Sequence, residues 1–213
     1  MSEQKPVLTL NEAALRWPGR NGTAVDALAP CSLKIFSGDR VVLRGPSGSG
    51  KTSLLLLAGG MLHPSSGTAQ HEGHVGFVFQ TLELLPYLNV RENILLGLRH
   101  QKQSSTDRVE ELLDVLGLTE RAHHRPHELS TGESQRAATA RALVSNPALI
   151  LADEPTGNLD DENAAIVLRA LAQQSEEGAA LILATHASVH GLQPTREFAL
   201  EAGKLTELEG TSG

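Results

Sequence analysis

The sequence predicts an α/β fold, because short apolar runs end in glycine- or aspartate-bearing turns and longer helical patterns follow them. Three such runs, Val75–Phe79, Ala148–Ala152 and Leu181–Ala184, are short and apolar enough to form buried strands. A fourth run, Arg40–Arg44, leads through a glycine-rich turn into a helical pattern over Lys51–Met61. We therefore expect a core of buried strands with helices between them.

Helices are predicted where apolar residues recur at helical spacing and glycine follows. Gly117 follows such a set, which consists of Val109, Leu112, Leu113 and Leu116. A second helix is expected over Asp161–Ser175, before Gly178. Near the ends, Leu33 and Ile35 alternate with polar residues as in a half-buried strand, and Phe198–Leu205 reads as a hairpin that turns at Ala202 and Gly203.

The middle of the chain, from about residue 81 to 145, carries helical patterns without convincing strands. We interpret residues 1–213 as a single domain, with a core lobe at about 1–80 and 146–213 and an inserted helical lobe at about 81–145. A small antiparallel β subdomain is expected to complete the mixed-sheet core. The alternative is one continuous doubly wound domain.

Composition excludes several classes of protein. The 213 residues are 40% hydrophobic, which is enough for an ordinary buried core. The net charge of −7 disfavours a broadly basic nucleic-acid surface, so no nucleic-acid partner is expected. Cys31, the single cysteine, has no partner for an internal disulfide. No apolar run approaches the roughly 20 residues that span a bilayer, and the polar N-terminus lacks a signal-peptide core, so we expect a globular cytoplasmic protein.

A complete phosphate-loop motif, G-x-x-x-x-G-K-[ST], follows the strand-like run Arg40–Arg44. Glycines in such a loop let successive N–H groups point at phosphate oxygens, and the next helix adds its positive N-terminal end. The lysine reaches the β- and γ-phosphates, and the threonine hydroxyl can ligate Mg²⁺. The motif predicts binding of a nucleoside triphosphate by Gly45, Pro46, Ser47, Gly48, Ser49, Gly50, Lys51 and Thr52, with the adjoining Ser53.

The apolar run Ala148–Ala152 ends in two carboxylates, Asp153 and Glu154. Beside a phosphate loop, an aspartate at a strand end can hold the shell of a Mg²⁺ ion. The adjacent Glu154 is then placed to polarise an attacking water as a general base. A charged turn at a strand end is the ordinary alternative, and the phosphate loop favours the catalytic interpretation.

The order of the motifs resembles the ATPase subunit of ATP-binding-cassette (ABC) transporters over nearly the whole chain. After the phosphate loop come Gln80, the segment Leu129-Ser130-Thr131-Gly132-Glu133, the Asp153-Glu154 strand end, Gly157-Asn158-Leu159-Asp160, and His186 after a strand. Each motif alone is weak, and all of them in this order are highly specific. The resemblance implies the ABC form of the phosphate-loop ATPase fold, with ATP and Mg²⁺ as cofactors.

The resemblance also implies a role for each matching residue. Gln80 resembles the glutamine that touches Mg²⁺ and the attacking water and that links the site to a membrane subunit. His186 resembles the histidine that contacts the γ-phosphate. Asp160 resembles an aspartate that communicates across a dimer, and it is also a candidate N-cap for the helix that begins at Asp161.

Residues 130–133 carry two compatible interpretations. Locally, Ser130 and Glu133 form a capping box at a helix start. The resemblance implies that Ser130, Gly132 and Glu133 present this helix start to the γ-phosphate on a second subunit. Thr131 stands where the family's LSGGQ has its first glycine, and Glu133 replaces the glutamine. Ala187, after His186, stands where the family often has aspartate.

Trp17 resembles the aromatic residue on which the adenine ring stacks. The alternative is a tryptophan of the core or of the turn that Pro18 and Gly19 make.

Three histidines around residue 125, namely His123, His124 and His127, could be interpreted as a metal site. They have no acidic partners at regular spacing, so a solvated connector is favoured.

The resemblance implies a dimer of ATPase subunits that powers separate integral membrane permease subunits from the inner face of the cell membrane. Residues 154–160 and 125–130 look most like the ATPases of lipoprotein-releasing and macrolide-exporting systems, and the division-associated ATPase is also close. The expected function is ATP hydrolysis for lipoprotein or lipid release or for export. The alternatives are an importer ATPase and a regulatory ATPase with little turnover.

Overall fold

The computed structural model describes residues 4–18, 24–98, 106–187, 189 and 191–208. Its strands are β1 (Leu8–Pro18), β2 (Ala24–Ile35), β3 (Arg40–Arg44), β4 (Ser66–His71), β5 (Val75–Val78), β6 (Leu149–Asp153), β7 (Ala180–Ala184), β8 (Arg196–Glu201) and β9 (Lys204–Leu208). Its α-helices are α1 (Lys51–Ala58), α2 (Val90–Leu95), α3 (Thr106–Val115), α4 (Thr131–Leu143) and α5 (Asp161–Glu176). None of these helices is long and apolar enough to cross a bilayer.

A six-stranded mixed sheet forms the centre of the molecule, with the strand order β5-β6-β7-β3-β8-β9. The first five strands are parallel to their neighbours, and β9 runs antiparallel to β8. Every residue of β6 and β7 is buried, as expected for parallel strands covered on both faces. The carboxyl ends of β3, β6 and β7 therefore meet at one edge of the sheet, where ligands of open α/β sheets bind.

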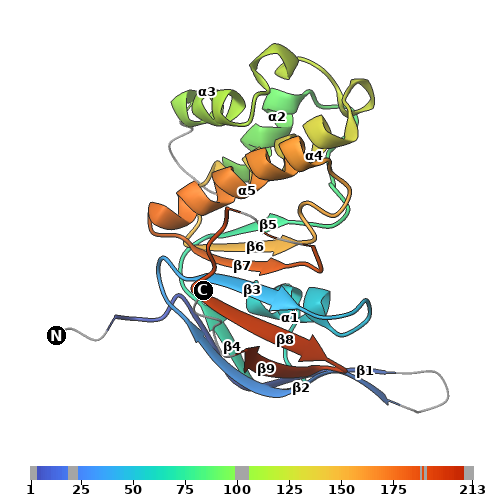
Figure 1. The fold of residues 1–213 in the computed structure, drawn as a ribbon, viewed down its shortest axis with the longest axis vertical. Coiled ribbons are helices and arrows are strands. Elements are labelled where there is room, and N and C mark those ends of the chain that lie inside the picture. The colour runs from blue at the N-terminus through green and yellow to red at the C-terminus, as the bar shows by residue number, and fades with distance from the viewer. Residues whose placement is uncertain (1–3, 19–23, 99–105, 188, 190, 209–213) are drawn as a thin grey trace.

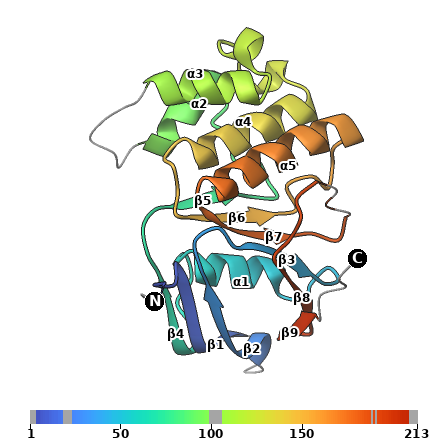
Figure 2. The ribbon, with the colours of Figure 1, turned by 60° about the vertical axis from the view of Figure 1, so that its left-hand side comes forward.

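Alternate residues of these strands belong to two separate cores. Ile150 and Ala152 of β6 pack with the helices α4 and α5 on one face. Leu149 and Leu151 pack on the other face with α1 and with a second sheet, which consists of β1, β2 and β4. Figure 2 shows α1 enclosed between the central sheet and this second sheet. Because successive side chains of a strand point to opposite faces, the central sheet packs against α4 and α5 on one face and against α1 and the second sheet on the other.

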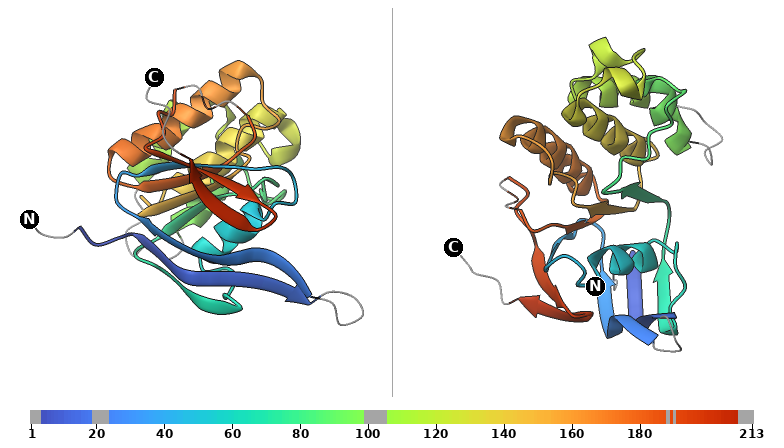
Figure 3. Two further views of the ribbon diagram at one scale, coloured as in Figure 1. Left: turned by 60° about the horizontal axis from the view of Figure 1, so that its bottom comes forward. Right: turned by 90° about the vertical axis from the view of Figure 1, so that its right-hand side faces the viewer.

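The second sheet is antiparallel and has the strand order β2-β1-β4. It forms the end of the molecule opposite α2 and α3 (Figures 1 and 3). The register pairs Leu8 with Ile35 at one end and Trp17 with Val25 at the other. The long β1–β2 pair therefore carries Trp17 to the edge at which the phosphate loop lies.

Between β5 and β6, the described residues form α2, α3, α4 and short 3-10 turns, and they contain no strand. The expected helical character of this stretch is confirmed. Figure 1 shows α2 and α3 beyond the sheet, with α4 and α5 lying side by side between them and β5. Helix α4 therefore contacts both the outer helices and the central sheet.

The helix expected over Lys51–Met61 is shorter, and it ends at Ala58. Gly60 adopts φ 70°, and the Met61 N–H donates to the Leu56 carbonyl at 2.9 Å. This is a Schellman end, in which a left-handed glycine turns the chain away from the helix axis. The same ending occurs at Gly117 and Gly178, as expected, although α5 runs on to Glu176.

The four short strands expected over Arg40–Arg44, Val75–Phe79, Ala148–Ala152 and Leu181–Ala184 form within a residue of those bounds, whereas β1 and β4 were not predicted and the expected hairpin extends to Leu208. The hairpin joins β8 to β9 through Ala202 and Gly203, whose φ values of 46° and 78° suit a tight turn. Cys31 is buried, and burial raises the pKa of its thiol to about 11. His123, His124 and His127 lie in the connector before α4, where they flank or enter short 3-10 turns.

Candidate functional site

The phosphate loop joins β3 to α1 and lies tightly against two strands. A Cβ on Gly50, whose φ is 108°, would stand 2.3 Å from the Ala27 carbonyl oxygen of β2. A Cβ on Gly45 would stand 2.2 Å from the Leu200 carbonyl oxygen of β8. No side chain caps the N-terminus of α1, so its first N–H groups are left for a ligand. The loop thus has the shape of an anion cradle.

A cavity of about 620 Å³ opens over this loop. It is lined by residues of β1, β2, the phosphate loop, β6 and the segments after β5 and β7. The sequence-predicted residues on its wall are Trp17, Gly45, Pro46, Ser47, Gly48, Gly50, Lys51, Thr52, Ser53, Gln80, Asp153, Glu154 and His186. Three further wall residues, Val25, Asp26 and Ala27, come from β2 and carry no motif. Ser49 is buried beneath the loop.

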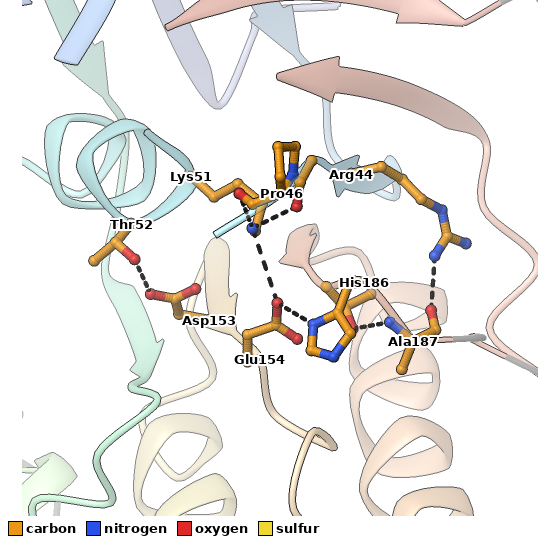
Figure 4. A network of polar contacts seen from close by, with 10 residues as sticks. Arg44, Pro46, Lys51, Thr52, Asp153, Glu154, His186 and Ala187 are labelled. Carbon is orange, nitrogen blue, oxygen red and sulfur yellow. Dashed lines mark hydrogen bonds and ion pairs between the residues drawn. The ribbon is translucent and has the colours of Figure 1, made fainter. Parts of the chain in front are cut away.

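Lys51 and His186 both face the Glu154 carboxylate (Figure 4). The Lys51 ammonium lies 4.0 Å from Glu154 Oε1 and donates to the carbonyl oxygens of Gly45 at 2.7 Å and Pro46 at 3.2 Å. His186 Nδ1 lies 2.9 Å from the same Oε1. Within the described part of the chain, the buried Oε2 of Glu154 has no hydrogen-bond partner.

The backbone at Glu154 is strained. Its φ of 48° lies in the left-handed region, which costs a non-glycine residue about 1 kcal/mol. The Glu154 N–H donates to the Ala184 carbonyl at 2.8 Å, and the Gly157 N–H donates to the Glu154 carbonyl at 3.3 Å. These bonds hold the chain in a sharp turn at the end of β6. Backbone strain of this kind is common at active sites and ligand-binding sites, where it fixes the orientation of a side chain.

Thr52 and Asp153 meet on the other side of the cavity. The Thr52 hydroxyl donates to Asp153 Oδ2 at 2.6 Å (Figure 4). Burial raises the pKa of Asp153, the Thr52 hydrogen bond opposes this rise, and the nearby Glu154 charge adds to it. Gln80 lines the same cavity. Hydroxyl, carboxylate and amide oxygens are hard donors that suit Mg²⁺, which is usually held by few protein ligands together with substrate phosphates.

Trp17 is the last residue but one of β1 and is 42% exposed, so it is not a core residue. Its strand partner is Val25, and both residues line the cavity beside the phosphate loop. An exposed ring at the mouth of a polar cavity offers a flat apolar surface to a planar ligand.

Besides the buried Ser49, four predicted residues do not line this cavity, namely Ser130, Gly132, Glu133 and Asp160. Ser130 caps α4 and forms the expected capping box with Glu133. Asp160 caps α5 by accepting from the Asn163 N–H at 2.8 Å. The two helix starts touch, because a Cβ on Gly132 would stand 2.7 Å from Asn163 Cγ. Within one chain, the segment that resembles the ABC signature therefore lies apart from the cavity over the phosphate loop.

Glu133 carries a negative charge at the first turn of α4. Its Oε1 accepts from Arg121 Nε at 2.7 Å and its Oε2 accepts from the Ser130 N–H at 2.8 Å. The Arg121 hydrogen bond is the main reason that the pKa of Glu133 falls to about 2, and the Ser130 N–H adds to it. The positive charge of Arg121 thus offsets the negative charge of Glu133 beside an exposed helix start.

The family profile described as ABC transporter matches residues 28–157, which include the phosphate loop, the capped start of α4 and the Asp153-Glu154 turn. The chain belongs to the ABC transporter family. This ABC cassette is 37% identical over 93% of its length to "Lipoprotein-releasing system ATP-binding protein LolD 1" of Rhodopirellula baltica, and it covers 96% of that protein. It is 40% identical over 94% of its length to the LolD protein of Novosphingobium aromaticivorans, of which it covers 98%.

A third relative is longer than this cassette. The chain is 39% identical over 86% of its length to "Macrolide export ATP-binding/permease protein MacB" of Bdellovibrio bacteriovorus, but it spans only 31% of that protein. Among solved structures, the dimeric MJ0796 cassette in a post-hydrolysis state bound to ADP and Pi matches with a TM-score of 0.86 and 30% identity, over 95% of this chain and 99% of that one. The expected ABC ATPase fold and the resemblance to LolD and MacB are confirmed.

Proposed function

We propose that this cassette is the ATP-hydrolysing subunit of a membrane complex that releases or exports lipoproteins or lipids, and that two copies share each ATP site. The observation that carries the proposal is the division of the motifs. Lys51, Asp153 and Glu154 gather around one cavity, whereas Ser130 and Gly132 stand at a separate helix start. Because these two sets of residues lie apart in one chain, a second copy is needed to surround the phosphates of a bound nucleotide.

In the proposed site, the adenine ring stacks on Trp17 and the phosphates lie in the loop from Gly45 to Ser53. The exposed ring and the tight glycine cradle support this placement. Thr52, Asp153 and Gln80 would hold Mg²⁺, which would supply positive charge at the β- and γ-phosphates. The Thr52–Asp153 contact of 2.6 Å already brings two of these donors together.

Glu154 is the proposed general base, and it takes a proton from the water that attacks the γ-phosphate. Its carboxylate lines the cavity, and its buried Oε2 has no hydrogen-bond partner among the described residues. His186 Nδ1 faces Glu154 Oε1, and a carboxylate only accepts hydrogen bonds. The ring therefore donates through Nδ1, and Nε2 can donate to a phosphate at the same time only when both nitrogens carry protons.

The second copy is proposed to contribute the start of α4, with Ser130, Gly132 and Glu133, and to exchange contacts through Asp160. The exposed helix start and its dipole favour an anion. Two solved structures of one relative, MJ0796, are described as dimeric, and this supports a dimer for the present chain. ATP would close the interface and hydrolysis would open it.

The proposed membrane partners are integral permease subunits, which would hold the cassette at the inner face of the cell membrane. The names of the LolD and MacB relatives support this branch. We place the contact on the helical lobe, residues 81–145, rather than on the core lobe, residues 1–80 and 146–213. Tyr87 and Leu95, beside and within α2, are exposed apolar residues of that lobe.

A regulatory ATPase with little turnover is the second candidate, and Thr131 favours it. Thr131 is the exposed first residue of α4 and adds a β-branched side chain at the proposed phosphate-facing helix start. Turnover of the purified chain separates the two candidates.

The test is Mg-ATP hydrolysis together with size-exclusion chromatography of Glu154→Gln. This variant keeps the side-chain shape, loses the base and is expected to accumulate as an ATP-bound dimer. Glu162→Gln, at an exposed position near the start of α5, is the matched control and should behave as the wild type. An unchanged hydrolysis rate in Glu154→Gln would overturn the assigned base, and a wild type without turnover would favour the regulatory candidate.

A further inference from the structure

Arg44 ends β3 and lies between the phosphate loop and the segment that carries His186. Strand β3 runs between β7 and β8, and Arg44 pairs with Ala199 of β8. The next residue, Gly45, opens the phosphate loop. On the other side, the Thr185 N–H donates to the Leu43 carbonyl at 3.1 Å, so the chain that leaves β7 begins beside the end of β3.

The Arg44 guanidinium makes two polar contacts across this edge of the sheet. One terminal nitrogen, Nη1, donates to the Ala187 carbonyl oxygen at 2.7 Å (Figure 4). The Nε atom donates to Glu197 Oε2 of β8 at 3.3 Å. Both side chains are about one-third exposed, so the pair is neither dry nor freely solvated. Glu197 therefore aims the guanidinium at the backbone of residue 187.

Residue 187 is held entirely through its backbone, because an alanine side chain offers no polar group. Its N–H donates to the hydroxyl of the buried Thr185 at 3.0 Å, and its carbonyl accepts from Arg44. His186 directly precedes the residue that carries both anchors. Its side chain is 72% exposed, and its contact with Glu154 at 2.9 Å is the polar side-chain contact that orients the ring. An exposed ring keeps one orientation only if its backbone is fixed.

We propose that Arg44 is a positioning residue for ATP hydrolysis, which holds the Ala187 carbonyl and thereby keeps the His186 ring against Glu154. This inference rests on the proposed function, because His186 is given its role there. The strand that positions the phosphate loop thus also positions the histidine, through one side chain. A charge-assisted hydrogen bond from a guanidinium to a carbonyl is strong enough to bias such a segment.

The test compares Arg44→Met with Arg40→Met. Arg40 begins the same strand, and its guanidinium pairs with Glu176 at 3.6 Å, so it is a matched control away from the phosphate loop. We expect Arg44→Met to lower kcat by about ten-fold while the KM for Mg-ATP stays within about two-fold, because orientation and not binding is lost. Arg40→Met should retain the wild-type values of both.

A spectroscopic readout separates positioning from a general structural effect. In ¹⁵N spectra, the wild-type His186 ring should show a protonated Nδ1, and Arg44→Met should show a mixture of tautomers. His186→Gln assigns the signal among the nine histidines and tests the role of the ring. A kcat equal to that of Arg40→Met, or an unchanged His186 signal, overturns the positioning role.

Failure of the proposed function has a different signature. If His186→Gln hydrolyses ATP as fast as the wild type, the role of His186 is wrong and the inference falls with it. If His186→Gln is slow and Arg44→Met is normal, the positioning role alone is overturned. Should Arg44→Met fail to fold, Arg44→Lys carries the test against Arg40→Lys, since lysine keeps the charge but loses the fork that bonds both Ala187 and Glu197.

Discussion

Gly50 should tolerate alanine much less well than Gly48, although both glycines belong to the phosphate loop. The Cβ of Gly50→Ala would stand 2.3 Å from the Ala27 carbonyl oxygen, where ordinary contact begins at 3.4 Å. The loop and β2 must therefore move apart by about 1 Å, and such overpacking costs about 1–3 kcal/mol. The positive φ of 108° adds about 1–2 kcal/mol of backbone strain. The expected loss of unfolding free energy is about 3 kcal/mol.

Gly48→Ala is the matched control, because its Cβ meets nothing within 4 Å and only its φ of 77° is unfavourable. Its expected cost is about 1 kcal/mol. Urea unfolding of both variants at one temperature measures the difference, and a chain of this size should also lose about 2–4 °C of melting temperature per kcal/mol. Equal destabilisation of the two variants would refute the claim that packing on β2 shapes the loop.

Three further predictions concern the nucleotide, pH and the two touching helix starts. Trp17→Ala should weaken ATP binding by about ten-fold, because one stacked base contributes about 1–3 kcal/mol; a nucleotide titration with unaltered affinity would return Trp17 to a structural role. Ionised Glu133 stabilises the fold above its ordinary pKa of 4.5, and this contribution is lost as pH falls toward about 2. Arg121→Gln should raise the pKa of Glu133 and flatten the loss of stability over that interval, and urea titrations at several pH values that match the wild type would contradict this. Gly132→Ala should cost about 1–3 kcal/mol by displacing Asn163, and Asn163→Ala should restore much of that loss in the double variant; an additive cycle in thermal unfolding would count against the contact.

The local signals in the sequence were sufficient where a residue type and its immediate neighbours decide the structure. Gly117 and Gly178 end helices because only glycine enters the left-handed region cheaply, and the sequence shows both. The capping box of Ser130 and Glu133 is likewise complete within four residues. The end of α1 carried the same signal at Gly60, but the leucine run before it favoured a longer helix.

Contacts between distant segments were not predictable from the sequence. Val25 and Asp26 line the cavity because the register of β1 and β2 sets them opposite Trp17 and Arg16, and strand register leaves no local motif. Arg44 reaches Ala187 across 143 positions of sequence. The left-handed backbone of Glu154 follows from its hydrogen bond to β7, and no sequence rule places such a conformation at a glutamate.

The central claim is that each ATP site is shared between two copies of the chain, and mixing two inactive variants tests it most directly. Lys51→Ala removes the phosphate-loop cation, and Ser130→Phe blocks the start of α4. In a shared-site dimer, random mixing makes half of the dimers mixed, and each mixed dimer has one intact site, so about one quarter of the wild-type hydrolysis should return. Mixed samples that stay as inactive as either variant alone would contradict the shared site.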